Sequence, residues 1–152
     1  RAHPNPPPCV VVTDEDLSDA EMLALHRRGD CLVSLARTEG WGLGLFEAAR
    51  LGRPVIASGY GGQMDYLGAD DCCIVPHHMV PVHEPTWAVS YRSCDRWAEP
   101  SVEQASRWMR AMVESPAGFR QRAARQGERI RNDFSSAAVT RRLLQALEGG
   151  AP

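Results

Sequence analysis

The segment "CLVSLARTEGWGLGLFEAARLGRPVIAS", residues 31–58, contains a strand, a glycine-rich loop, a helix and a second strand in one short stretch. The apolar runs at 31–36 and 53–58 have the length and the branched side chains of buried strands. Between them an apolar helical pattern starts near Leu43 and ends at Gly52. Because a helix joins the two strands, we expect them to run parallel in one sheet.

The same alternation extends to both sides of this segment. The β-branched run at 9–13 is predicted as a strand, and the helix after it is capped by Ser18 and stopped by Gly29. The apolar positions of that helix are Met22, Leu23 and Leu25. After a second glycine loop, residues 59–67, the run at 71–76 is predicted as another strand. We therefore expect an α/β fold, a Rossmann-like parallel sheet with helices on both faces.

The carboxyl-terminal part reads differently. Residues 77–100 interrupt the alternation and are predicted as a long irregular connection. A helix capped by Ser101 follows, and Pro116 with Gly118 separates it from two further helices with arginine-rich, solvated outer faces. The positions of the first helix expected to be buried are Val102, Ala105, Trp108, Met109 and Met112.

Length and composition limit the possible classes of protein. A chain of 152 residues, 43% hydrophobic and with a net charge of −2, is expected to form one globular domain over 1–152 without a nucleic-acid-binding surface. No apolar run is long enough for a transmembrane segment and no signal peptide is visible, so a cytoplasmic location is expected. All 17 basic residues are arginines, which excludes a P-loop lysine or a lysine Schiff base.

The five cysteines have no metal-binding spacing and are expected to be buried free thiols; they are Cys9, Cys31, Cys72, Cys73 and Cys94. A metal site drawn from Cys72, Cys73, His77, His78 and His83 is the less favoured alternative, because adjacent residues of a strand point to opposite faces. No metal ligand is therefore assigned.

The glycine loop at 37–42 carries the candidate site. In a parallel sheet, ligands bind beyond the carboxyl ends of the strands, where loops lead into helix amino-termini. The free backbone amides expected to hold an anion such as a diphosphate belong to Gly40, Trp41, Gly42, Leu43 and Gly44. Glu47, one turn into the helix, can accept hydrogen bonds from a ribose diol, and Glu39, in the loop, can hold sugar hydroxyls.

Each of these residues also has a plainer interpretation. Glu39 alone could be a loop surface residue, and Glu47 alone a carboxylate favoured by the helix dipole. Their combination with a glycine loop, which weakens helix initiation, favours a binding site. For Trp41, two interpretations stay open: its ring packs against the protein, or it forms the wall of a sugar site. Tyr60, beside the second glycine loop, has the same two interpretations.

Residues 30–67 resemble the donor-binding domain of GT4-type retaining glycosyltransferases, enzymes of the GT-B fold. Glu39 and Glu47 fit the Glu-x7-Glu signature of that family, and "EAARLGRPVIAS" and "GYGGQMDYL" resemble its next two motifs. "WAEPSVEQASRWMR" resembles a later motif of a tryptophan-bearing branch, so that the similarity extends over about residues 9–135.

The resemblance implies a transfer of a hexose from a UDP- or GDP-sugar to an acceptor hydroxyl, with retention. It assigns a catalytic contact with the donor hexose to Glu39, the phosphates to the amides around Trp41 to Gly44, and the ribose to Glu47. It also implies no cofactor and no obligatory metal, because basic side chains and helix dipoles stabilise the leaving diphosphate in such enzymes.

The chain departs from the family in several places. It lacks the usual Arg and Lys of the diphosphate clamp, and Asp65 stands where Glu is common. It begins with Arg1 instead of methionine, and the resemblance starts near the middle of the domain. We therefore expect a fragment that lacks the amino-terminal acceptor domain as its partner, that is inactive alone, and that is able to self-associate through an exposed sheet edge.

Two other functions compete with this prediction. The isolated chain could be a non-catalytic nucleotide-sugar-binding or scaffold module. Alternatively, the glycines at 40, 42 and 44 could belong to a dinucleotide-dependent oxidoreductase. Their spacing is not Gly-x-Gly-x-x-Gly, and the loop begins too late after the strand for the tight dinucleotide turn, so that the oxidoreductase is the more remote alternative.

Overall fold

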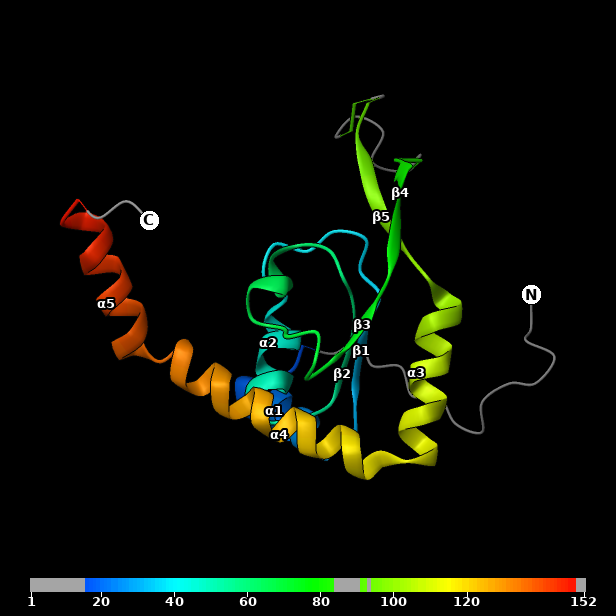
Figure 1. Ribbon diagram of the computed structural model, residues 1–152, viewed down its shortest axis with the longest axis horizontal. Helices are drawn as coiled ribbons and strands as arrows, with labels where there is room; N and C mark the ends of the chain where they lie inside the picture. Colours follow the sequence, from blue (N-terminus) through cyan, green and yellow to red (C-terminus); the bar gives the residue numbers. More distant parts are fainter. Residues whose placement is uncertain (1–15, 84–90, 93, 150–152) are drawn as a thin grey trace.

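Three parallel strands form the centre of the protein. The computed structural model describes residues 16–83, 91–92 and 94–149; the predicted strand at 9–13 lies outside them. The sheet has the order β1-β2-β3, and its strands are β1 (Leu32–Ser34), β2 (Val55–Ser58) and β3 (Cys73–Val75) (Figure 1). Val33 pairs with Ile56, and Ala57 pairs with Ile74. The predicted parallel sheet of an α/β fold is confirmed.

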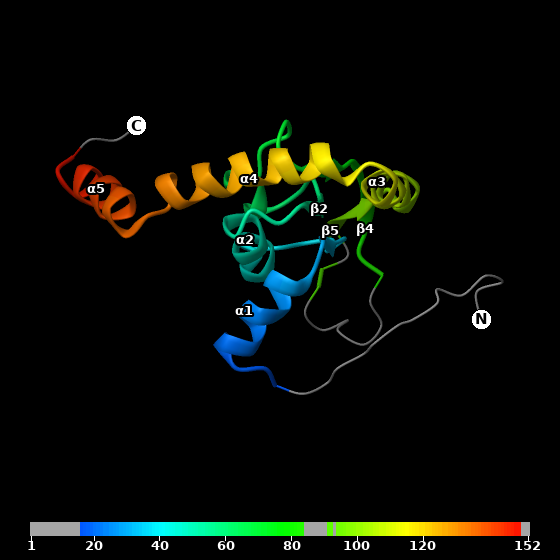
Figure 2. The ribbon, with the colours of Figure 1, turned by 90° about the horizontal axis from the view of Figure 1, so that it is seen from below.

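The central strand β2 separates two hydrophobic clusters. Its side chains alternate, so that Val55 and Ala57 join one cluster and Ile56 joins the other. The first cluster contains residues of α2 (Leu43–Arg50) and α4 (Pro116–Asp133). The second contains Ala105 and Met112 of α3 (Val102–Glu114). Figure 2 shows α2 and α3 on opposite sides of the strands, so the sheet is covered on both faces as expected.

Serine caps determine where several helices begin. Ser18 and Glu21 form a capping box at the start of α1 (Asp19–Arg28), and Gly29 ends this helix. Ser101 caps α3, and Ser135 caps α5 (Ser136–Leu147) by accepting a hydrogen bond from the Ala138 amide. The predicted caps at Ser18 and Ser101 are therefore confirmed. None of the helices in the described part of the chain is long and apolar enough to cross a lipid bilayer.

Residues 77–100 differ from the expected irregular connection. They contain β4 (His77–Pro81) and β5 (Arg96–Pro100), which pair antiparallel as a separate two-stranded ribbon. The prolines hid this ribbon in the sequence because proline interrupts a strand pattern. In the structure Pro81 and Pro100 occupy strand ends, where Pro100 lies opposite His77 and Pro81 lies opposite Arg96.

Several apolar helix positions are more exposed than the sequence predicted. Val102 is 63% exposed and Met109 48%, whereas Ala105 and Met112 are buried and Trp108 is half-buried. In α3, the residues that pack in the cluster beside the sheet are Ala105, Trp108 and Met112. Helix α1 projects from the body (Figure 2), and its apolar residues Leu23 and Leu25 are likewise exposed.

The junction of α3 and α4 also corrects a prediction. Pro116 and Gly118 were expected to separate two helices, but Pro116 is the first residue of α4 and Gly118 lies inside it. A proline at this position is favourable because its missing amide would have no helical partner. A single residue, Ser115, therefore links the two helices.

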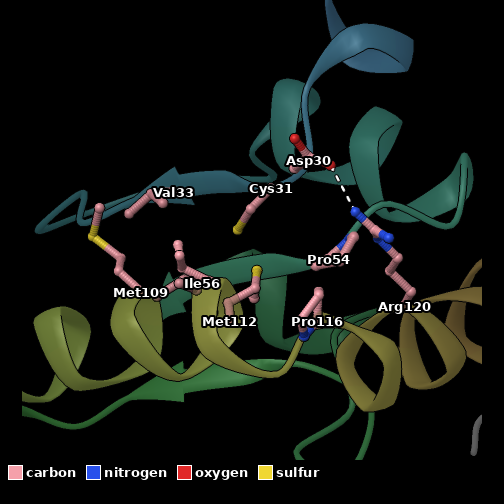
Figure 3. Close-up of a pocket in the computed structure, with 10 residues that line it drawn as sticks. Asp30, Cys31, Val33, Pro54, Ile56, Met109, Met112, Pro116 and Arg120 are labelled. Carbon is pink, nitrogen blue, oxygen red and sulfur yellow. Dashed lines mark hydrogen bonds and ion pairs between the residues drawn. The ribbon is translucent and has the colours of Figure 1, made fainter. Parts of the chain in front are cut away.

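An apolar pocket of about 480 Å³ lies between α3 and the β1–β2 side of the sheet (Figure 3). Met109 and Met112 of α3 face Val33 and Cys31, and the ion pair from Arg120 to Asp30 closes one end. Among the described residues, β1 pairs only with β2. Self-association through this strand edge stays a prediction. The pocket extends to Asp30 and Pro54, which lie just before β1 and β2 in the chain. Ligands of parallel sheets bind at the opposite ends of the strands.

The contact of α4 with α2 can be tested by two glycine substitutions in one helix. A methyl group at Gly127 would lie 2.8 Å from the Gly52 nitrogen, whereas nothing lies within 4 Å of one at Gly118. Gly127→Ala is expected to lower the free energy of unfolding by about 1–3 kcal/mol. Gly118→Ala should leave it unchanged or raise it by about 0.5 kcal/mol. Urea denaturation measures both; equal effects would contradict the packing described.

Candidate functional site

The start of α2 is open to a ligand. Loop 37–42 leaves the carboxyl end of β1, and Gly42 precedes the helix with a left-handed φ of 75°. No side chain caps the helix, and the first amide donating along the helix comes from Phe46 to the Gly42 oxygen, at 2.8 Å. The amides of Leu43, Gly44 and Leu45 have no such internal acceptor, as in the first turn of any helix. The predicted helix start at Leu43 is confirmed.

The second glycine loop packs directly against the first. The Gly62 amide donates to the Glu39 carbonyl oxygen at 3.0 Å. A side chain at Gly62 would overlap the carbonyl of Gly40, and one at Gly61, where φ is 104°, would overlap that of Glu39. The two loops therefore meet backbone to backbone, an approach that only glycine permits.

Tyr66 holds the same loop from within the core. Its side chain is fully buried, and its hydroxyl lies 2.9 Å from the Trp41 carbonyl oxygen and 3.0 Å from that of Gly42. Burial, and secondarily the charge of Glu39, raises the pKa of the Tyr66 hydroxyl, so it stays protonated and donates. The sequence analysis missed this residue, whose only signal was an aromatic side chain closing the second glycine loop.

The ring of Trp41 belongs to an aromatic cluster. Its centroid lies 5.5 Å from Phe46, 5.0 Å from Tyr66 and 5.5 Å from Phe134. These rings pack against the core between α2 and α4. Of the two interpretations of Trp41, the structure favours packing for the ring. Tyr60 stacks edge-on against His77, at 5.2 Å.

Glu39 lies where the two glycine loops meet. Its Cγ lies 3.2 Å from the position that a Cβ at Gly42 would occupy. Its carbonyl oxygen accepts a hydrogen bond from the Gly62 amide. Around it, Gly40 and Gly44 have open space on the side where a side chain would stand, and Leu43 is 69% exposed. At the helix start, Leu43 and Gly44 are therefore exposed, whereas Gly42 is buried.

Glu47 has different surroundings. Its side chain is 51% exposed, and Oε2 lies 3.3 Å from Nε2 of His26 on α1. It borders a pocket of about 580 Å³ between α1, α2 and α4; the other lining residues are Asp19, Met22, Leu23, Arg50, Leu51 and Arg131. Glu39 does not line this pocket. A single pocket shared by Glu39 and Glu47 therefore stays a prediction.

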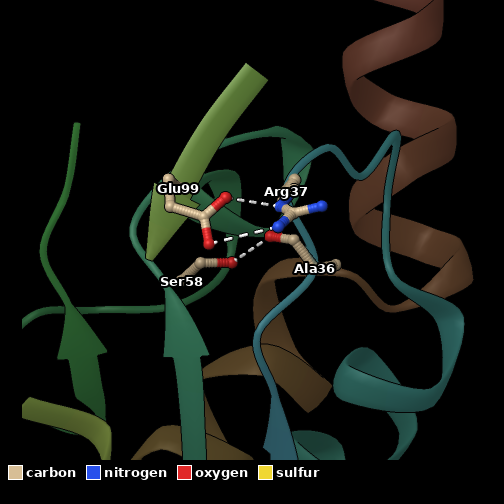
Figure 4. Close-up of polar contacts among 4 residues, drawn as sticks. All are labelled: Ala36, Arg37, Ser58 and Glu99. Atoms are coloured by element: carbon tan, nitrogen blue, oxygen red, sulfur yellow. Dashed lines mark hydrogen bonds and ion pairs between the residues drawn. The ribbon is translucent and has the colours of Figure 1, made fainter. Parts of the chain in front are cut away.

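Arg37 connects the start of loop 37–42 to the β4–β5 ribbon. Its Nε donates to Oε2 of Glu99 at 2.6 Å and its Nη2 to Oε1 at 3.2 Å (Figure 4). The guanidinium also lies over the ring of Trp97, 4.6 Å from its centroid. Beside it, the Ser58 hydroxyl donates to the Ala36 carbonyl at 2.5 Å. The sequence did not indicate Arg37, because its partner stands 62 residues away.

The described residues contain no group of three or more His, Cys, Asp or Glu side chains that could hold a metal ion. Cys72 and Cys73 join different hydrophobic clusters, as expected for neighbours in a strand. Burial raises the pKa of Cys72 to about 12 and that of Cys31 to about 11, so both stay thiols at neutral pH. Cys94 is exposed, contrary to the expectation for all five cysteines, and Cys9 lies outside the described residues.

The hydrogen bonds of Tyr66 can be tested without changing the ring. Tyr66→Phe removes the one hydroxyl proton that lies within reach of the Trp41 and Gly42 carbonyl oxygens, and is expected to lower the free energy of unfolding by about 1–2 kcal/mol. The hydroxyl of Tyr60 has no hydrogen bond to the described residues, so Tyr60→Phe should change the free energy of unfolding by less than about 0.5 kcal/mol. Chemical denaturation of both variants checks this; a Tyr66→Phe protein as stable as wild type would contradict it.

Comparison with known families agrees with this geometry. The family described as "Glycosyl transferases group 1" matches residues 13–79. The matched region includes β1, α2, β2 and both glycine loops. No curated protein matches the sequence. The match covers less than half of the 152 residues, and the parallel sheet of this region agrees with a group 1 glycosyltransferase domain.

Proposed function

We propose that this chain is the donor-binding part of a retaining, GT4-type glycosyltransferase that transfers a hexose from a UDP- or GDP-sugar to an acceptor hydroxyl. The observation that carries the proposal is the uncapped start of α2 at the carboxyl end of β1, inside the region matched by the family. Backbone amides and the positive end of the helix dipole attract an anion there.

The diphosphate of the donor is the anion proposed for this site. The amides of Leu43 and Gly44, with those of Gly40, Trp41 and Gly42 in the loop, would donate hydrogen bonds to it. Negative charge grows on the leaving diphosphate as the glycosidic bond breaks, so donors fixed before the reaction favour the transition state. These amides replace a basic clamp in the proposal, since Arg37 is neutralised by Glu99. An obligatory divalent cation is not part of it.

The two glutamates are proposed to hold the neutral parts of the donor. Glu39, where the glycine loops meet, would accept hydroxyl hydrogen bonds from the hexose beside the reacting carbon. Glu47, one turn into α2, would accept those of the ribose. Each hydrogen bond to a carboxylate contributes about 1.5–3 kcal/mol to binding.

The acceptor is proposed to bind to another domain, as the resemblance implies, so that this chain alone would bind the donor without transferring the sugar. A non-catalytic nucleotide-sugar-binding module would behave in the same way in a binding experiment. Addition of an acceptor-binding domain separates the two functions, because only a transferase half would then release nucleoside diphosphate from the donor.

Titration of the 152-residue chain by isothermal calorimetry tests the proposed donor site. UDP or GDP and the matching nucleotide sugar are expected to bind, and NAD is not. Glu47→Gln should weaken nucleoside diphosphate binding about tenfold. Glu39→Gln should weaken the nucleotide sugar more than the nucleoside diphosphate.

Glu103→Gln provides the matched control for these two variants. It removes an exposed glutamate on α3, which pairs only with Arg107 one turn away, and should leave all affinities unchanged. Binding of NAD in preference to both nucleoside diphosphates, or equal affinities in wild type and Glu47→Gln, would contradict the proposal.

A further inference from the structure

His26 is the one buried side chain of α1. Its side chain is 7% exposed, whereas Met22 is half-buried and the other residues of the helix are exposed. Nε2 is fully enclosed and has no hydrogen bond of good geometry to the described residues. Burying a polar N–H without a partner costs about 1–3 kcal/mol, so an enclosed imidazole nitrogen points to an acceptor close by.

Glu47 is the acceptor within reach. Its Oε2 lies 3.3 Å from Nε2. The other surroundings of the imidazole are largely apolar: it borders a pocket of about 360 Å³ with Met22, Leu25 and Leu32. Arg53, at the same pocket, is engaged with the carbonyl of Arg27.

We propose that His26 is a positioning residue for the donor: through Nε2 it fixes the carboxylate of Glu47 toward the nucleoside. This inference rests on the proposed function. A carboxylate has about four acceptor positions, so Glu47 can accept from His26 and still accept two hydroxyl hydrogen bonds on its exposed side.

Such a contact strengthens ligand binding because a free glutamate side chain has many rotamers. An unrestrained Glu side chain loses up to about 2 kcal/mol of rotamer entropy when a ligand fixes it. His26 is buried on the side of α1 that lies next to α2, so its hydrogen bond would hold Glu47 before the nucleoside arrives. Helix α1 would thereby act on the donor site without touching the donor.

A purely structural role makes a different prediction. If Glu47 only satisfies the buried imidazole, loss of the pair lowers stability but does not distinguish one ligand from another. A positioning role affects ligands that carry a ribose and spares those that carry only phosphates. Inorganic diphosphate is therefore the ligand that separates the two roles.

Two substitutions of His26 form the test. Phenylalanine keeps a buried ring but has no donor, and the side-chain amide of glutamine can place a donor where Nε2 stands. His26→Phe is expected to weaken binding of UDP or GDP about tenfold and to leave the affinity for inorganic diphosphate unchanged. His26→Gln should stay within about threefold of wild type for both ligands. Calorimetry gives the affinities, and circular dichroism shows that each variant is folded.

A double-mutant cycle with Glu47→Gln shows whether His26 acts through Glu47. The combined variant should bind nucleoside diphosphate no more weakly than Glu47→Gln alone, because both changes remove one interaction. The inference is overturned if the two losses add, if His26→Phe binds like wild type, or if diphosphate affinity falls equally. A wild-type chain that binds no nucleoside diphosphate refutes the proposed function itself and removes the basis of the inference.

Discussion

Two backbone segments meet with no side chains between them at the carboxyl end of the sheet. Loop 37–42 lies against Gly61 and Gly62, and the Tyr66 hydroxyl donates to it from below. Because the loops touch through their backbones, the first loop is fixed although it contains Gly40 and Gly42. The start of α2 depends on this contact: no side chain caps it, yet it has a defined position.

The aromatic cluster explains how a glycine-rich loop can be ordered. A loop of this composition loses much conformational entropy when it is fixed. Trp41 offsets that cost by packing its ring on Phe46, Tyr66 and Phe134, which come from three other parts of the chain. The ring of Trp41 packs against the core, and the backbone of Trp41 remains in the loop. Donors fixed in advance in this way are what the transfer of a phosphate-linked sugar requires.

The sequence predicted the fold well where local signals were strong. Apolar runs and glycine stops placed β1, α2 and β2 within a few residues of their observed bounds, and Ser18 and Ser101 placed the starts of α1 and α3. The sequence did not predict features that depend on contacts between residues far apart in the chain. Tyr66 reaches carbonyls 24 and 25 residues away, and Arg37 pairs with Glu99 across 62 residues; neither partner is visible in a linear pattern. The β4–β5 ribbon was missed because prolines at strand ends resemble the prolines of a loop.

The amides at the start of α2 are the most direct test of the account. A ¹⁵N-labelled chain titrated with UDP or GDP should show its largest amide shifts at residues 40–44, with slower hydrogen exchange at Leu43 and Gly44 in the complex. Shifts confined to other parts of the chain, with residues 40–44 unchanged at saturation, would contradict the claim that this helix start binds the diphosphate.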